Sequence, residues 1–231
     1  MEYNFAEGEI LLINKPLDWT SFDVVKKVRN TIRVKKVGHA GTLDPLATGL
    51  LILCTGKYTK RIDEIQAQEK EYTGSIRLGE VTPSYDRETE VTETCDITHL
   101  TLEDINAAAQ SFVGTIEQVP PIYSAVMVDG KRAYDLARKG KSAELKPRTI
   151  TIKAFDITKV EGAELYFRVI CTKGTYIRSL AHDLGQKLGC GAHLSSLVRT
   201  RIGEYKLEDA LTIEDIQEIR KKQLEANGSN S

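Results

Sequence analysis

The stretch Gly38–Gly49 (GHAGTLDPLATG) places one carboxylate, Asp44, in a loop bounded by glycines and leads directly into the apolar run Leu50–Cys54. An acid held at the entrance of a buried strand is a candidate nucleophile or base. The competing interpretation is that Asp44 caps a helix begun by Pro45, which is a favoured way for a helix to start. Because a glycine and a strand-like run follow so soon after Pro45, the pattern favours a functional loop.

Length and composition are those of an ordinary globular protein. The chain has 231 residues, of which 41% are hydrophobic and 28% charged, and this is enough for one large domain with its own core. The N-terminal residues lack the basic start and apolar core of a signal peptide, and no apolar run is long enough to cross a bilayer. These features predict a cytoplasmic protein with no membrane association, a single domain at residues 1–226 and a disordered polar tail at 227–231.

The four cysteines are scattered along the chain without a Cys-x-x-Cys pair. This distribution is typical of reduced thiols and not of a disulfide framework. Cys190 and His193 are spaced like half of a metal site, but no second pair lies at the spacing that zinc requires. The sequence therefore predicts neither a disulfide nor a metal centre.

The formal net charge of −1 is the sum of segments of opposite sign. Residues 24–41 carry six bases and no acid, and residues 131–153 carry eight bases against Asp135 and Glu144. Such segments are candidate contacts for the phosphates of a nucleic acid. The alternative for each single basic run is a solvated helix face.

Hydrophobic periodicity and end signals predict an alternation of strands and helices. Strands are predicted over residues 9–16, 50–54, 72–78, 150–157 and 164–171. Helices are predicted over residues 21–32 with Ser21 as the cap, 59–68, 101–112, 176–188 and from 212 onwards, and capping boxes open the helices at 101 and 212. Residues 117–148 lose regular strand character, and so long a connection is typical of a functional excursion.

Several separated segments carry the residues suited to chemistry, and their chain order is informative. They are Asn14-Lys15-Pro16, residues 38–49, Lys70-Glu71-Tyr72, Pro120–Ala125, and Cys171–Arg178 with Gly189–His193. In this order and spacing the chain resembles the TruB family of tRNA pseudouridine synthases from about residue 9 to residue 203. The resemblance implies the α+β pseudouridine synthase fold, in which helices and loops flank a mixed, mostly antiparallel central sheet.

The same resemblance implies an activity. It implies an isomerase that converts uridine 55 in the T arm of tRNA to pseudouridine, without a cofactor or metal. It further implies a monomer with no obligate protein partner. The chain ends soon after Tyr205, so we expect it to lack the C-terminal RNA-binding domain of many relatives.

By resemblance, the catalytic residues are Asp44 as nucleophile, Arg178 as its partner and Tyr72 as the final proton acceptor. Tyr72 and Tyr176 hold the target uracil, which must leave its stack before it can react, and aromatic rings are suited to receive it. A guanidinium would keep the carboxylate charged. Each tyrosine taken alone is equally a packing residue, and Arg178 alone is an exposed base of the first helical turn. Whether Asp44 attacks C6 of the base or assists at the ribose stays open.

Further substrate contacts are implied at four positions. His39 helps to fill the gap left by the flipped nucleotide, or is an ordinary loop residue. Leu197 contacts the substrate base, or is an ordinary core leucine. Lys15 supports the active-site loop together with Pro16, or contacts a phosphate. Asp86 carries over as an RNA contact or a structural contact.

Residues 117–148 match the RNA-gripping insertion of the family. The basic residues there are Lys131, Arg132, Arg138, Lys139 and Lys141, and the flat side chains are Tyr123 and Tyr134. Two rival functions stay open. One is an RNA-binding or tRNA-folding protein in which catalysis is secondary or lost. The other is a hydrolase that uses Asp44 as its base, which needs a water-activating partner that the sequence near Asp44 does not offer.

Overall fold

The computed structural model describes residues 3–124, 127–128, 131–132 and 145–228. The chain divides into two compact units. Unit 1 comprises residues 1–71 and 198–231, and unit 2 comprises residues 72–197. Strands β4 (Lys70–Leu78) and β12 (Ala192–Ile202) contain residues of both units.

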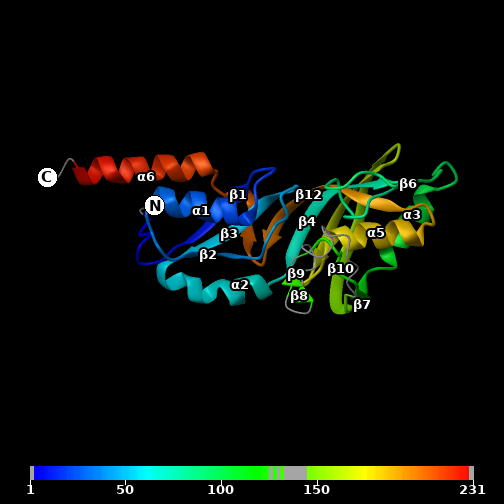
Figure 1. Cartoon of the computed structure of the whole chain (residues 1–231), viewed down its shortest axis with the longest axis horizontal. Coiled ribbons are helices and arrows are strands. Elements are labelled where there is room, and N and C mark those ends of the chain that lie inside the picture. Colours follow the sequence, from blue (N-terminus) through cyan, green and yellow to red (C-terminus); the bar gives the residue numbers. More distant parts are fainter. Residues whose placement is uncertain (1–2, 125–126, 129–130, 133–144, 229–231) are drawn as a thin grey trace. The chain divides into compact units, whose positions relative to one another are not determined.

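Unit 1 has a sheet with helices on both faces (Figure 1). Strands β1 and β2 both pair antiparallel with β3, and β3 also neighbours β12. The elements are β1 (Ile10–Lys15), α1 (Ser21–Ile32), β2 (Val37–Ala40), β3 (Ala47–Thr55), the 3-10 helix η1 (Gly56–Arg61), α2 (Ile62–Ala67), β13 (Tyr205–Lys206), the 3-10 helix η2 (Leu207–Asp209) and α6 (Ile213–Gly228).

Side chains of β3 alternate between the two faces of this sheet, as a strand requires. Leu51 and Leu53 pack with the apolar faces of α1 and α6. Leu50 and Ile52 pack on the other face with Ile65 of α2. Both faces of β3 are therefore buried, which explains why its sequence is a continuous apolar run.

Unit 2 is built on antiparallel strands. Strand β10 lies between β11 and β7 and pairs antiparallel with both. Phe155 of β10 and Phe167 of β11 meet edge to face in the core, with ring centroids 6.1 Å apart. The remaining elements are β5 (Glu80–Val81), β6 (Glu93–Thr94), α3 (Leu102–Gln110), β7 (Gly114–Gln118), β8 (Met127–Val128), β9 (Lys131–Arg132), β10 (Arg148–Glu161), β11 (Glu164–Cys171) and α5 (Ile177–Lys187).

The predicted α+β class with a mostly antiparallel sheet is confirmed. Capping boxes at Thr101 and Thr212 are also confirmed, because each hydroxyl accepts the backbone N–H of the aspartate three residues later. The cap of α1 was predicted wrongly. Thr20 caps it in a box with Asp23, and Ser21 is buried as the first helical residue.

No helix follows Pro45, so the helix-cap interpretation of Asp44 is wrong. The backbone N–H of Ala47 donates to the carbonyl of Asp44 at 3.0 Å, which closes a turn, and the chain then enters β3. The predicted helix over 59–68 is divided between η1 and α2. Strand β12 was not predicted.

Residues 117–148 begin and end in regular structure. Gln118 of β7 pairs with Arg148 of β10, so the ends of the excursion lie on neighbouring strands. Residues 133–144, with Tyr134, Arg138, Lys139 and Lys141, lie outside the described part of the chain. In the expected tail, residues 227 and 228 belong to α6 and residues 229–231 are not described. The single catalytic domain stays a prediction.

Candidate active site

The Asp44 loop connects β2 to β3 within unit 1. Gly41 and Gly49 adopt positive φ angles of 87° and 100°, which explains why glycines bound the loop. Leu43 is buried and anchors the loop, whereas Asp44 is only partly buried. The loop therefore presents a carboxylate from an anchored backbone.

Lys15 supports this loop through its ammonium group, which binds a carbonyl of the loop backbone. Its side chain is fully buried, and Nζ donates to the carbonyls of Pro16 at 2.8 Å, Trp19 at 2.5 Å and Pro45 at 3.3 Å. Burial lowers the pKa of the ammonium group to about 8, although the charge of Asp44 acts in the opposite direction. A phosphate contact would require Nζ to leave these carbonyls, so the geometry favours the role of Lys15 as a support.

Two buried side chains that the sequence did not connect with this loop also hold it. The hydroxyl of Ser21 accepts the N–H of Leu43 at 2.8 Å and donates to the carbonyl of the same residue at 3.1 Å. The guanidinium of Arg199 donates to the carbonyls of Gly41 and Thr42. Together with the bond from Lys15 to the carbonyl of Pro45, these contacts hold the backbone on both sides of Asp44.

His39 lies on β2, at the start of the same segment. One ring nitrogen, Nε2, is 3.2 Å from the hydroxyl of Thr42. Burial lowers the pKa of the imidazole, and the nearby Arg199 charge acts in the same direction. Both effects favour the neutral ring, which is suited to packing against a base.

Arg178 lies in the first turn of α5 in unit 2 and is buried, so the interpretation as an exposed base is wrong. Its Nε is 3.6 Å from Oδ2 of Asp86, and Nη1 donates to the carbonyls of Tyr123 at 2.9 Å and Ser84 at 3.4 Å. Asp86 is therefore a structural contact of Arg178, one of the two roles expected for it.

The two tyrosines of the predicted site lie in unit 2. Tyr72 is buried on β4, and Tyr176 is the partly buried N-cap residue of α5. Gln118 of β7 fixes Tyr176, since its amide accepts the tyrosine N–H at 2.8 Å and donates to the tyrosine carbonyl at 3.0 Å. Leu197, also in unit 2, is buried on β12. No sequence pattern marked Gln118.

The structure describes the predicted residues in two groups. Lys15, His39 and Asp44 belong to unit 1. Tyr72, Tyr176, Arg178 and Leu197 belong to unit 2. Lys131 and Arg132 form β9, whose backbone pairs antiparallel with β8.

The possible metal half-site is occupied by backbone contacts. The thiol of Cys190 donates to the carbonyl of Gly191, and Nδ1 of His193 is 3.2 Å from the carbonyl oxygen of Glu80. Among the described residues, no group of three or more His, Cys, Asp and Glu side chains is placed to hold a metal. Within the same part of the chain, no helix has the length and apolar character needed to span a membrane.

Comparison with solved structures gives similar chains in two multi-component complexes. A chain of the archaeal box H/ACA sRNP Nop10-Cbf5 complex is 27% identical, with a TM-score of 0.72 over 96% of this chain and 57% of that one. A chain of a Cbf5-Nop10-Gar1 complex is 31% identical, with a TM-score of 0.73 over 93% of this chain and 54% of that one. The present chain thus spans somewhat more than half the length of these solved chains.

Comparison with curated proteins gives relatives of similar length. The tRNA pseudouridine synthase B of Phocaeicola vulgatus is 53% identical over 221 residues, which are 93% of this chain and 94% of that protein. The tRNA pseudouridine synthase B of Bacteroides thetaiotaomicron is 52% identical over 239 aligned positions, which cover 99% of this chain and 100% of that protein.

Family models match most of the chain. Residues 29–177 match the N-terminal domain of the TruB family pseudouridylate synthases, and residues 178–227 match the C-terminal domain of tRNA pseudouridylate synthase B. The first match contains the Asp44 loop, and the second begins at Arg178. Together with the relatives of more than 50% identity, these matches mean that the chain belongs to the TruB family of pseudouridylate synthases.

Proposed function

We propose that this chain isomerises uridine 55 in the T arm of tRNA to pseudouridine, with Asp44 as the nucleophile. The substrate class is supported by the names of the relatives, which are tRNA pseudouridine synthases. The observation that carries the proposal is the Asp44 loop, whose backbone is held by buried side chains on both sides of a partly exposed carboxylate. A nucleophile held in this way loses little entropy when it meets its substrate.

The reaction needs no external reagent. The bond from ribose C1′ to N1 of uracil breaks, a bond from C1′ to C5 forms, the hydrogen of C5 leaves as a proton, and N1 gains a proton. Atoms and electrons therefore balance within the nucleotide. In the proposal, the ionised carboxylate of Asp44 makes the covalent intermediate that lets the base detach and turn.

In this proposal, residues of unit 2 bind the uracil, and one of them partners the Asp44 carboxylate. Tyr72 and Tyr176 hold the flipped base, and Leu197 contacts it from β12. Tyr72 also accepts the proton that leaves C5. Arg178 partners the Asp44 carboxylate, a role suited to a guanidinium that is already desolvated and oriented by carbonyls and by Asp86.

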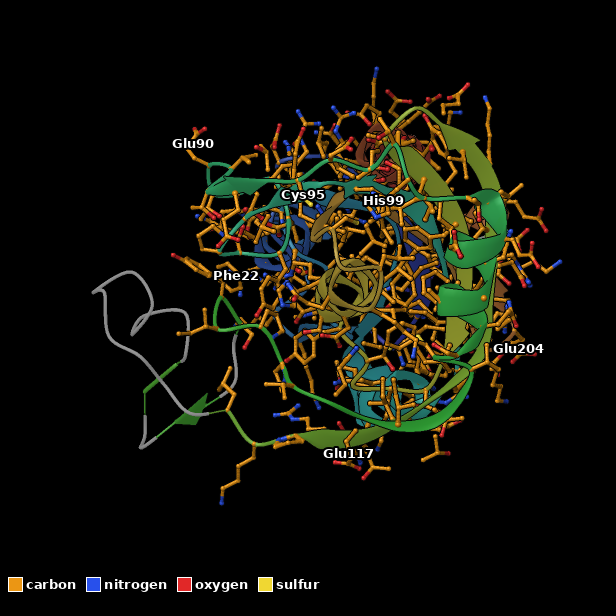
Figure 2. The ribbon with its side chains drawn as sticks, turned by 90° about the vertical axis from the view of Figure 1, so that its right-hand side faces the viewer. Phe22, Glu90, Cys95, His99, Glu117 and Glu204 are labelled. Atoms are coloured by element: carbon orange, nitrogen blue, oxygen red, sulfur yellow. The ribbon has the colours of Figure 1, made fainter. Side chains whose placement is uncertain are left out.

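The basic face of α1 is the proposed contact for the tRNA backbone. Lys26 and Lys27 are exposed there, and Arg33, Lys35 and Lys36 follow at the end of the helix. Phe22 is 65% exposed on the same helix and points away from the ribbon (Figure 2). Cations beside an exposed aromatic ring suit an RNA surface, because they neutralise phosphates and offer a face on which a base can stack. His39, Lys131 and Arg132 are proposed as further RNA contacts.

We propose that the protein acts as a monomer in the cytoplasm, where tRNA is matured, without cofactor, metal or obligate protein partner. Size-exclusion chromatography with light scattering of the purified chain, alone and with T-arm RNA, measures the oligomeric state. A mass equal to one chain is expected in the first case, and one chain plus one RNA in the second. A stable dimer would contradict the proposal.

The experiment that tests the function is tritium release from T-arm RNA labelled at C5 of its uridines. The expected result is release of one tritium per RNA, lost when the residue at position 55 is cytidine. A chain that binds the RNA without releasing tritium would instead be a binding protein. Equal release from the RNA with cytidine at position 55 would overturn the assignment of the target.

A further inference from the structure

Arg199 is a fully buried cation on β12, within unit 1, where its side chain is 1% exposed. The guanidinium donates from Nε to the carbonyl of Leu50 at 2.8 Å, from Nη2 to that of Gly41 at 2.9 Å and from Nη1 to that of Thr42 at 3.4 Å. Every one of these acceptors is a backbone carbonyl. The side chain of Arg199 therefore holds the surrounding backbone in position.

The carbonyls that Arg199 binds lie on opposite sides of the Asp44 loop. Gly41 and Thr42 precede Asp44, and Leu50 follows it in β3. One guanidinium thus ties the first residues of the loop to strand β3, which leaves it. Gly41, Thr42 and Leu50 thus form the neck of the loop that carries the proposed nucleophile, and Arg199 joins them.

Gly49 shows how closely β3 and β12 approach at this neck. A Cβ added to Gly49 would lie 2.5 Å from the carbonyl oxygen and 2.8 Å from the nitrogen of Arg199. The φ of Gly49 is 100°, a conformation that side chains rarely adopt. Only glycine at this position lets the backbone of Arg199 lie against the end of the loop.

Stability alone is a poor explanation for this arrangement. Burying a guanidinium carries a desolvation cost, and an apolar side chain of similar volume is often at least as stabilising. A lysine offers a point charge, whereas the planar fork of arginine reaches acceptors on two segments at once. The contacts of Arg199 therefore indicate a role that depends on the planar shape of its guanidinium.

We propose that Arg199 is a positioning residue, which ties the start of the Asp44 loop to strand β3 and thereby holds the Asp44 carboxylate in its reactive position. The proposal rests on the proposed function for its effect on turnover, but the tie itself is a property of the loop. Arg199 acts through the backbone of Gly41, Thr42 and Leu50 and needs no contact with the RNA.

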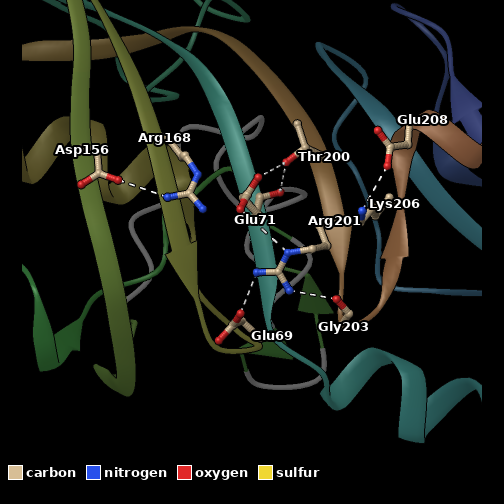
Figure 3. Close-up of polar contacts among 9 residues, drawn as sticks. All are labelled: Glu69, Glu71, Asp156, Arg168, Thr200, Arg201, Gly203, Lys206 and Glu208. Carbon is tan, nitrogen blue, oxygen red and sulfur yellow. Dashed lines mark hydrogen bonds and ion pairs between the residues drawn. The ribbon is translucent and has the colours of Figure 1, made fainter.

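The test compares Arg199→Lys with Arg201→Lys in the full chain. Arg201 is the control, since it is an arginine two residues further along β12 that pairs with Glu69 at 2.7 Å and Glu71 at 3.8 Å and donates to the carbonyl of Gly203 at 2.8 Å (Figure 3). These three partners are outside the Asp44 loop in the sequence. Single-turnover and steady-state tritium release give kcat and KM, and hydrogen exchange gives the opening of the amides of residues 42–47.

For Arg199→Lys we expect kcat to fall on the order of a hundredfold, the size of effect that a displacement of about 1 Å has on a reacting group. The KM for T-arm RNA should stay within about threefold, because the RNA-binding face is untouched. Amides of residues 42–47 should exchange faster, while those in the middle of β3 keep their protection. Arg201→Lys should change none of these quantities.

An unchanged kcat in folded Arg199→Lys would overturn the proposal, as would unchanged exchange in the loop. If Arg199→Lys does not fold, Arg199→Gln is measured in its place; failure of both to fold would make Arg199 a purely structural residue and also overturn it. Absence of tritium release from the wild type would overturn the proposed function instead, and the exchange comparison would still decide whether Arg199 ties the loop.

Discussion

The ion pair between Arg178 and Asp86 gives a sharp prediction about stability. The two side chains are 5% and 7% exposed, and Nε lies 3.6 Å from Oδ2. Asp86→Asn removes the negative charge with almost no change in shape, and the amide oxygen can still accept the N–H of Glu88, as Oδ1 of Asp86 does at 2.9 Å. The substitution therefore isolates the loss of charge opposite a buried guanidinium.

Breaking a buried pair by removing one partner typically costs about 3–5 kcal/mol when the other charge is left uncompensated. Arg178 keeps its hydrogen bonds to the carbonyls of Tyr123 and Ser84 and, in the proposed function, the Asp44 carboxylate as a partner, so we expect the lower end of that range, about 3 kcal/mol. For a protein of this size, such a loss lowers the melting temperature by roughly 6–12 °C.

The assay is urea and thermal unfolding followed by circular dichroism at pH 7. The control is Asp156→Asn, which breaks the exposed pair between Asp156 and Arg168, at 3.2 Å with side chains 49% and 40% exposed (Figure 3). An exposed pair contributes at most about 1 kcal/mol. If Asp86→Asn and Asp156→Asn cost the same within about 0.5 kcal/mol, the reasoning from burial is refuted.

Three further predictions follow from local contacts. Thr20→Ala removes the capping box of α1 and should cost about 1 kcal/mol of unfolding free energy. Thr31→Ala, within the same helix, is the control and should cost less than about half as much. Urea midpoints measure both losses, and equal losses would contradict the assignment of the cap. Burial raises the pKa of Asp183 to about 6 from 3.8, so the native state binds this proton more tightly than the unfolded state, and the stability of wild type relative to Asp183→Asn should fall from pH 4 to pH 6 and stay flat above it. A difference that rises with pH in that window would be the wrong sign. Replacement of Lys26 and Lys27 by Gln should make the fall of log affinity for T-arm RNA with log salt less steep, by about 0.9 for each phosphate that these lysines neutralise in the wild type. An unchanged slope would show that α1 is not part of the RNA-binding surface.

Local signals were the part of the fold that the sequence predicted well. Thr101 and Thr212 each precede an aspartate by three residues, and both capping boxes are present because such a box is closed within one turn. The cap of α1 was missed although the same signal was available. Thr20 stands three residues before Asp23, whereas Ser21 has no acid at that spacing.

Long-range contacts were the part that the sequence did not predict. Strand β12 was missed because one of its buried positions holds Arg199, so the segment does not read as an alternation of apolar and polar residues. A charged residue is normally exposed, and its partners at Gly41 and Leu50 are distant in the sequence. Gln118 was missed for the same reason, since only the fold brings it to Tyr176.

The Asp44 loop was recognisable because its signals are local. The glycines at its ends have the positive φ angles that only glycine adopts easily, and Asp44 precedes a buried strand as predicted. The side chains that hold the loop come from β1, α1 and β12, three elements that no sequence pattern connects. The proposed reactive group was therefore assigned from sequence, and the side chains that support its loop were found only in the structure.

The most direct test of the central claim is the turnover of Asp44→Asn. Asparagine keeps the size of the side chain and removes the nucleophilic oxygen anion, so tritium release from C5-labelled T-arm RNA should fall by at least about a thousandfold. The dissociation constant for the same RNA should stay within about threefold of wild type, a change of less than about 1 kcal/mol. Turnover by Asp44→Asn at a tenth of the wild-type rate or more, with binding intact, would contradict the assignment of Asp44 as the nucleophile.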